Sequence, residues 1–168
     1  NLMAGKKYPI FSADKIVYNL YKKKKFNKIL IKKFKLDSKK KIKNQIKKIL
    51  EKNKNNLSKL EYIVHPFVRK EMTDFIKKKN KMLFLEIPLL IESRLNKYFD
   101  KIVFVGANKD LRLKRYLKKK GDKKTFKLLN NRQLSFKQKK NISDYTIINN
   151  YSLATLKKNV KIFIKKYE

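Results

Sequence analysis

Three acidic residues lie at or near the ends of apolar stretches in a chain whose charged residues are mostly lysine. Asp14 ends the stretch YPIFSAD, and Glu86 and Glu92 lie within the stretch FLEIPLLIES. A carboxylate within hydrogen-bond reach of a hydroxyl group can accept its proton, which makes Asp14 the candidate for general-base chemistry. Glu86 and Glu92 could order a site for an anionic ligand through hydroxyl groups, Mg²⁺-bound water or neighbouring arginines. Asp14 could instead cap a following helix, and Glu92 could cap a helix or pair with Arg94.

A histidine and an arginine stand one helical turn apart in the sequence HPFVR. These are His65 and Arg69. On one face of a helix, the two side chains could meet an anionic or hydroxyl-rich ligand together. The alternatives are a capping or core role for His65, which precedes Pro66, and a surface ion pair for Arg69.

The residue types exclude several other kinds of site. The chain has no cysteine, so it has no disulfide, no thiolate metal site and no cysteine nucleophile. It has a single histidine, so it cannot build a metal site from several histidines. We therefore predict no metal ion held by the protein alone.

Lysine supplies most of the large positive charge. The formal net charge is +35, and of the 48 basic residues five are arginines and the other 43 are lysines. The lysines are spread along the chain, whereas nucleic-acid readers usually rely on arginine for bidentate contacts. The abundance of Lys, Asn, Ile, Phe and Tyr indicates the bias of an A/T-rich genome, and a basic nucleic-acid-binding protein is the alternative. In either case the positive field attracts polyanions, including nucleotides.

The sequence contains no signal for a membrane or for secretion. No uninterrupted apolar stretch is long enough to cross a bilayer, and no secretory signal pattern is visible. We predict a cytoplasmic protein with no membrane partner and no specific nucleic-acid partner. Its 168 residues suffice for one domain with a core and small appended subdomains. The sequence does not indicate an oligomeric state.

Four short apolar stretches predict the strands of a mostly parallel sheet. They cover residues 8–14, 82–87, 101–107 and 145–149. The second, MLFLEI, is almost entirely apolar and is followed by Pro88, which is typical of a central strand buried on both faces. Ligands of such sheets bind outside the carboxyl ends of the strands, so we expect Asp14, Glu86 and Glu92 to face a crevice and not the core.

Helices are predicted between and after these strands, which indicates an α/β fold. In the first half of the chain, helical spacing of apolar residues predicts a helix over 13–34, one or two amphipathic helices within 38–64 and a helix that begins at Pro66. In the second half, it predicts a helix from 108 that ends before Gly121, a polar helical stretch to about 142 and a last helix over 152–167.

The motifs along the chain resemble those of dephospho-coenzyme A kinases. SADKIVYNLY, LEYIVHPFVRKEM, LFLEIPLLIES, KIVFVGANKDLRLKRYLKK and SDYTIINN follow one another as the family's D-A-D-x-I, H-P-x-x-R, P-L-L-x-E, arginine-bearing lid and D-N motifs do. The resemblance covers essentially the whole chain, and H-P-x-x-R and P-L-L-x-E in this order are fairly specific. It implies a P-loop kinase that uses ATP and Mg²⁺ to phosphorylate the ribose 3′-hydroxyl of dephospho-coenzyme A, the final step of coenzyme A synthesis.

The resemblance also implies a division of the chain and a missing part. Residues 1–37, 81–110 and 143–168 would form the α/β core, residues 38–80 a helical subdomain for the acceptor, and residues 111–142 a helical lid. The family's Walker A motif, G-x-x-x-x-G-K-[ST], holds the phosphates of ATP but occurs nowhere in these residues, which contain only three glycines. We expect that the first strand and the P-loop are absent from this chain and that it is inactive alone.

Family roles carry over to the positions that match the motifs. Asp14 matches the catalytic aspartate that accepts the hydroxyl proton, although the first aspartate of that motif is Ser12 here. His65, Arg69 and Glu92 match residues that face the acceptor.

For ATP and the lid, the resemblance implies a group of four basic residues and one asparagine, which match the family to different degrees: Arg112, Arg115, Lys119, Arg132 and Asn149. Arg115 matches a family arginine, whereas Lys119 stands where an arginine is usual and so loses the bidentate fork. Arg132 lies near a family position, and Ile148 replaces the aspartate before Asn149. The expected partners are dephospho-coenzyme A and ATP, and a nucleoside or nucleoside monophosphate kinase is the alternative within the same class.

Overall fold

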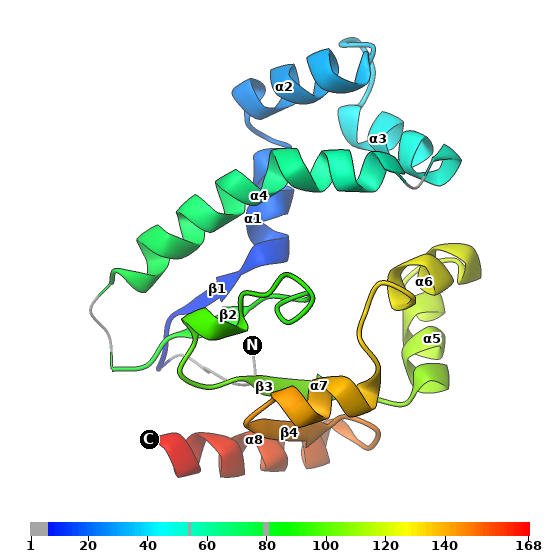
Figure 1. The fold of residues 1–168 in the computed structure, drawn as a ribbon. Helices are drawn as coiled ribbons and strands as arrows, with labels where there is room; N and C mark the ends of the chain where they lie inside the picture. Colours follow the sequence, from blue (N-terminus) through cyan, green and yellow to red (C-terminus); the bar gives the residue numbers. More distant parts are fainter. Residues whose placement is uncertain (1–6, 54, 79–80) are drawn as a thin grey trace. The chain divides into compact units, whose positions relative to one another are not determined.

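The computed structural model describes residues 7–53, 55–78 and 81–168. These residues fall into two compact units, one within Lys6–Ile87 and one within Pro88–Glu168, which we call the N-terminal and the C-terminal unit. Each unit contains one short parallel ladder of two strands with helices around it (Figure 1).

The N-terminal unit begins with a strand that leads directly into a helix. Strand β1 (Ile10–Ser12) pairs in parallel with β2 (Phe84–Glu86), and Ser12 lies opposite Glu86. Helix α1 (Ala13–Leu20) starts at the next residue, with Ser12 as its extended N-cap. The carboxyl ends of both strands therefore lie at the same edge, beside the first turn of α1.

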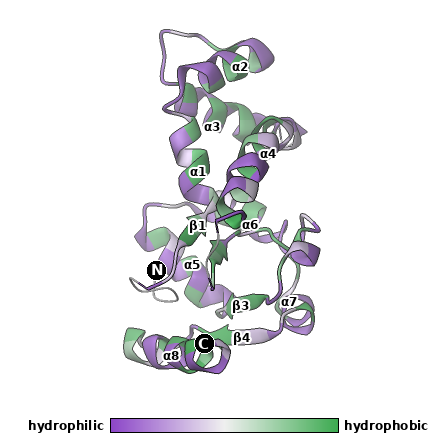
Figure 2. Cartoon of the chain, turned by 90° about the vertical axis from the view of Figure 1, so that its left-hand side faces the viewer, coloured by the Kyte–Doolittle hydropathy of each residue, from purple (hydrophilic) through white to green (hydrophobic). Residues whose placement is uncertain are grey.

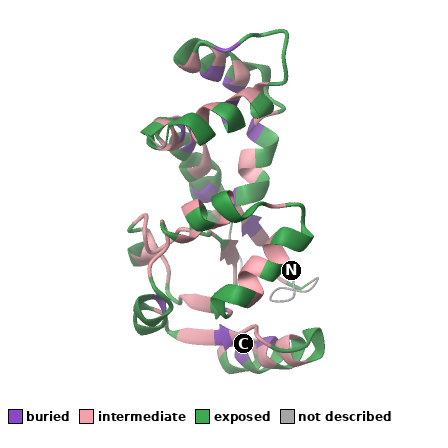
Figure 3. Cartoon of the chain, turned by 90° about the vertical axis from the view of Figure 1, so that its right-hand side faces the viewer, coloured by how far each residue is buried: buried purple, intermediate pink, exposed green. Residues whose placement is uncertain are grey.

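Helices form most of the N-terminal unit and enclose its core. They are α1, α2 (Lys24–Phe34), α3 (Ile42–Lys52) and α4 (Asn55–Ile76). Hydrophilic and hydrophobic residues alternate along these helices (Figure 2), and each helix contributes buried residues (Figure 3). The buried cluster consists of Leu20, Phe26, Leu30, Leu36, Ile46, Leu60 and Val64. This apolar burial stabilises the unit despite its lysine-covered surface.

The helix predicted over 13–34 is wrong, because the structure has two helices there. The N–H groups of Lys22 and Lys23 donate to the carbonyls of Asn19 and Leu20, which tightens the end of α1. The side chain of Asn27 donates to the Tyr21 carbonyl at 3.0 Å. The break falls in the run of four lysines at residues 22–25. It lets α2 turn its own apolar face toward the core.

The predicted helix start at Pro66 is also wrong, because Pro66 lies inside α4. A proline in a helix lacks the N–H that would bond to the carbonyl four residues earlier, at a cost of about 3 kcal/mol or more. Tyr62 is 82 % exposed, so water can reach the helix surface near its carbonyl. Burial of Leu60, Val64 and Met72 on the opposite side of α4 offsets the lost hydrogen bond.

The C-terminal unit is built on the second ladder. Strand β3 (Val103–Gly106) pairs in parallel with β4 (Tyr145–Ile148), and α8 (Leu153–Tyr167) packs on β4. The rings of Tyr145 and Phe163 lie 5.1 Å apart, and Ile147 is almost fully buried. The remaining elements are the 3₁₀ helix η1 (Asn96–Tyr98) and the helices α5 (Lys109–Lys118), α6 (Lys123–Asn130) and α7 (Phe136–Ile142).

A glycine closes the turn between α5 and α6, as predicted. The N–H of Gly121 donates to the Tyr116 carbonyl at 3.1 Å. A Cβ atom at this position would overlap the Tyr116 ring, so a side chain does not fit here without a shift of the ring. Lys120, the residue before it, has a left-handed backbone with φ 61°.

The α/β fold with parallel strands and flanking helices is confirmed, and each predicted strand is present in shortened form. The second strand is not fully buried as predicted, because Phe84 and Leu85 are half-buried and Glu86 is exposed. The division into core, acceptor subdomain and lid stays a prediction. Within the described part of the chain, no helix has the length and apolar character needed to cross a membrane.

Candidate active site

Asp14 lies in the first turn of α1, two residues after the end of β1. It is not the helix cap, because Ser12 occupies that position. Its side chain is only partly exposed and has no hydrogen-bond or ion-pair partner among the described residues. Asp14 therefore does not cap the helix, and its carboxylate is available to a ligand.

The carboxylate of Asp14 has an altered proton affinity. Partial burial raises its pKa above the usual range, and the negative charge of Glu86 raises it further. Glu86 ends β2 opposite Ser12, so both acids belong to the same edge of the ladder. A raised pKa brings a carboxylate closer to the range in which a general base is effective.

His65 and Arg69 lie one turn apart on α4, and both are exposed. Neither side chain has a partner among the residues that the structure describes. The alternatives of a core histidine and of a surface ion pair for Arg69 are thus absent in this part of the chain. The pair leaves an imidazole and a guanidinium group free on one helix face.

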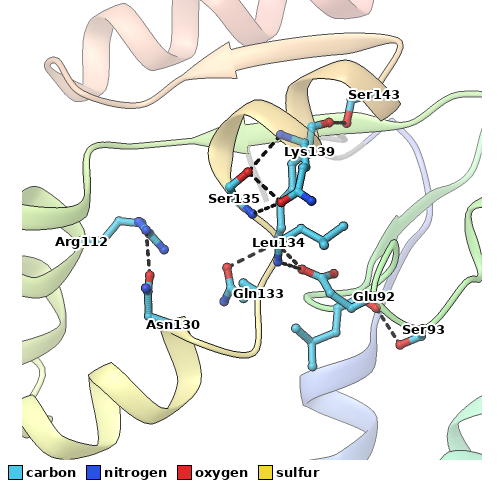
Figure 4. Close-up of polar contacts among 11 residues, drawn as sticks. Glu92, Ser93, Arg112, Asn130, Gln133, Leu134, Ser135, Lys139 and Ser143 are labelled. Atoms are coloured by element: carbon cyan, nitrogen blue, oxygen red, sulfur yellow. Dashed lines mark hydrogen bonds and ion pairs between the residues drawn. The ribbon is translucent and has the colours of Figure 1, made fainter.

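Glu92 belongs to the C-terminal unit and is held inside it (Figure 4). Its side chain is 13 % exposed, and Oε1 lies 3.0 Å from Nζ of Lys139. The N–H of Leu134 donates to the same oxygen at 2.9 Å. Burial raises the pKa of Glu92, but hydrogen bonds from its own N–H, from Lys139 and from Leu134, with the charge of Lys139, outweigh this and lower it overall. The partner of Glu92 is therefore Lys139 and not Arg94.

Two predicted arginines of the C-terminal unit bind polar groups of neighbouring segments. Arg115 donates from Nη1 to the carbonyl of Asn149 at 2.8 Å, so the structure brings these two predicted residues together. Arg112 donates from Nη2 to Oδ1 of Asn130 at 2.9 Å (Figure 4). The Nε atom of Arg112 is buried and has no partner in the described part of the chain. Both arginines lie on α5, which they connect to the end of β4 and to α6.

Two further predicted residues lie apart from these contacts. Lys119 is the exposed C-cap of α5. Arg132 lies in the segment between α6 and α7 and takes part in an interaction of its own.

A cavity of about 200 Å³ opens between α5 and α6, lined by Lys109, Leu113, Lys123, Phe126, Lys127, Asn130 and Asn131.

A known family matches most of the chain. The family model described as dephospho-CoA kinase matches residues 1–155. The chain belongs to the dephospho-CoA kinase family. A dephospho-CoA kinase of Fusobacterium nucleatum is 33 % identical, over 96 % of this chain and 86 % of the relative. One from Bartonella henselae is 30 % identical, over 93 % and 84 %. Family membership favours the kinase interpretation over a nucleic-acid-binding protein.

Solved structures share the fold of this family member. The crystal structure of TT1252 from Thermus thermophilus matches with a TM-score of 0.78 at 21 % identity, over 98 % of this chain and 87 % of that chain. Dephospho-CoA kinase from Campylobacter jejuni matches with a TM-score of 0.65 at 23 % identity, over 99 % and 88 %. Both likenesses support the α/β architecture.

Two residues that shape the surroundings of the predicted site carry no signal in the sequence. Lys139 pairs with Glu92, but in a chain with 43 lysines nothing distinguishes this one. Asn130 accepts from Arg112, and a polar residue near a helix end carries no signal of its own. Glu86 is recognisable in the sequence as a carboxylate at a strand end, but its effect on the pKa of Asp14 depends on the pairing of β1 with β2.

Proposed function

We propose that this chain catalyses the reaction of its family, with Asp14 as the proton acceptor. In this reaction the γ-phosphoryl group of ATP passes to the ribose 3′-hydroxyl of dephospho-CoA and gives coenzyme A and ADP. The observation that carries the proposal is the unpaired Asp14 carboxylate, whose pKa is raised at the carboxyl edge of the β1–β2 ladder. Ligands of parallel α/β sheets bind at such edges.

Asp14 would act on the acceptor hydroxyl. Its carboxylate accepts the proton of the 3′-hydroxyl as the ribose oxygen forms a bond to the γ-phosphorus. The bond between this phosphorus and the bridging oxygen to the β-phosphate breaks, and ADP leaves with the electron pair. A positioned carboxylate also orients the hydroxyl in line with the leaving group, which is most of what a protein can contribute to phosphoryl transfer.

His65 and Arg69 would bind the acceptor. Their exposed, unpartnered side chains on α4 support this role, since an arginine can give a phosphate two parallel hydrogen bonds. Dephospho-CoA is long enough to reach along the helices of residues 38–80, whereas a mononucleotide is not. This difference in length is the physical basis for selecting dephospho-CoA as the acceptor.

The C-terminal unit would supply cations for ATP. Arg115 gives the Asn149 carbonyl one hydrogen bond, and a guanidinium group has five N–H donors, so others can face phosphate oxygens. Arg112, Lys119 and Arg132 are proposed as further contributors from the same part of the chain, 111–142, acting as a lid.

Mg²⁺ would enter with ATP. No group of three or more acidic, histidine or cysteine side chains suited to a metal occurs in the described residues. Mg²⁺ is commonly held by substrate phosphates and water with few protein ligands, so the proposal does not depend on such a group. When bound, the ion neutralises charge on the phosphates.

Acceptor selectivity tests the proposal. The assay uses residues 1–168 with the Walker A segment of a relative joined ahead of residue 1, and residues 1–168 alone as the reference. Mass spectrometry follows coenzyme A formed from dephospho-CoA and ATP, with AMP, CMP and adenosine as competing acceptors. We expect kcat/KM to be highest for dephospho-CoA. A preference for AMP would instead make the chain a nucleoside monophosphate kinase.

A further inference from the structure

Lys139 differs from the other lysines of the described chain because it is buried. It is 8 % exposed and is the only charged residue among those described that lies in the buried class. Its Nζ lies 3.0 Å from Oε1 of Glu92 and donates to Oε1 of Gln133 at 3.2 Å. An ammonium group is costly to bury unless it is paired, so a general bias toward lysine does not account for this position.

The partner of Lys139 is also withdrawn from solvent. Oε1 of Glu92 is taken up by Lys139 and by the N–H of Leu134, and Oε2 is buried without a partner in the described chain. A ligand could reach this carboxylate only after a rearrangement. The arrangement therefore suits a structural connection better than direct contact with a substrate.

The connection joins two segments that are distant in sequence. Glu92 lies in the turn of residues 88–95, which is closed on itself by hydrogen bonds from the Ser93 N–H and hydroxyl to the Leu89 carbonyl. Leu134 and Lys139 belong to the end of the loop before α7 and to α7 itself. One ion pair and one hydrogen bond thus hold the turn of residues 88–95 against α7 and the residue before its N-cap (Figure 4).

We propose that Lys139 is a positioning residue for acceptor binding. Its ammonium group holds Glu92 and, through it, the turn of residues 88–95 in the conformation that the acceptor requires. The inference rests on the proposed function, because the family resemblance assigns this turn to the acceptor site. It replaces direct contact between Glu92 and the acceptor with an indirect role.

The test compares Lys139→Met with Lys140→Met in residues 1–168. Lys140 is the exposed neighbour of Lys139, so both variants lose one charge from α7. Hydrogen exchange of the Leu134 amide reports the connection, and calorimetry with dephospho-CoA reports acceptor affinity. In Lys139→Met we expect exchange to be faster and affinity to be lower, each by about tenfold or more, and Lys140→Met should match the wild type.

A double variant separates positioning from general stability. Lys139→Met leaves Glu92 buried and unpaired, which lowers Tm; adding Glu92→Gln removes that charge. We expect Lys139→Met/Glu92→Gln to regain most of the lost Tm while the affinity for dephospho-CoA stays low. If Tm and affinity recover together, the ion pair only stabilises the fold and the proposal is overturned.

Failure of the two proposals is distinguishable. Wild-type binding of dephospho-CoA with unchanged affinity in Lys139→Met overturns the positioning role alone. Absence of wild-type binding contradicts the proposed function, and it overturns the positioning role as well, because that role is defined by the acceptor. A Leu134 amide that exchanges equally fast in Lys139→Met and wild type overturns the connection itself.

Discussion

Asp14 and Glu86 share the carboxyl edge of the β1–β2 ladder, and the charge of Glu86 helps to raise the pKa of Asp14. Burial is the larger cause of this shift. A like charge nearby makes ionisation of Asp14 less favourable, so this edge raises the proton affinity of Asp14 at some cost in stability. The kinetic predictions below use the chain with the joined Walker A segment described above.

Asp14→Asn removes the proposed proton acceptor. We expect kcat to fall by about 10² or more, the usual scale for loss of a general base, and KM for ATP to stay nearly unchanged. Steady-state kinetics with both substrates measures this. Near wild-type turnover would return Asp14 to a purely structural role.

The same variant should not lose stability near neutral pH. Because the folded pKa of Asp14 is raised, its contribution to stability is present below the unfolded pKa and is lost as the pH rises through the folded pKa. The ionised carboxylate therefore opposes folding near neutral pH, and asparagine removes that effect. Calorimetry should show an equal or slightly higher Tm for Asp14→Asn near neutral pH, and the difference should vanish in acid. A clearly lower Tm near neutral pH would contradict the raised pKa.

Glu86→Gln should move the acid limb of the pH–rate profile. Asp14 must be ionised to accept a proton, so kcat/KM falls as the pH drops through its pKa. Loss of the Glu86 charge lowers that pKa, and the acid limb moves to lower pH. Glu51→Gln, an exposed charge on α3, is the matched control and should leave the profile in place. An unmoved limb in Glu86→Gln would show that Asp14 does not control it.

Arg69→Ala should weaken acceptor binding. We expect KM for dephospho-CoA to rise by the equivalent of about 1.5–3 kcal/mol, the range for a hydrogen bond to a charged group, and KM for ATP to change little. Lys157→Ala removes one charge from an exposed position of α8 and serves as the control. An effect of Arg69→Ala on ATP alone would assign Arg69 to the other substrate.

Gly121→Ala should destabilise the fold. The added Cβ meets the Tyr116 ring, and such overpacking typically costs about 1–3 kcal/mol. Urea unfolding measures the loss. Lys120→Gly is the companion variant and should be neutral or stabilising, since Lys120 already has a left-handed backbone. A fully stable Gly121→Ala protein would show that the ring moves aside at no cost.

Local pattern was sufficient for much of the fold and for part of the site. The four strands and the helices around them follow from apolar spacing, because secondary structure at these positions depends on neighbouring residues. The pattern also located Asp14 after a strand, and His65 and Arg69 one turn apart on a helix. Family motifs then supplied the reaction, which no spacing could have provided.

Contacts between distant residues decided the rest. The break between α1 and α2 and the passage of α4 through Pro66 depend on which side chains reach the shared core, so local helix signals failed there. The part of the Asp14 pKa shift that comes from the charge of Glu86 requires β2 to pair with β1, some 70 residues away in sequence. Lys139 acquires its distinct environment only because α7 packs where Glu92 can meet it. A lysine is ordinary in sequence and becomes specific only when folding removes its water and supplies its counter-charge.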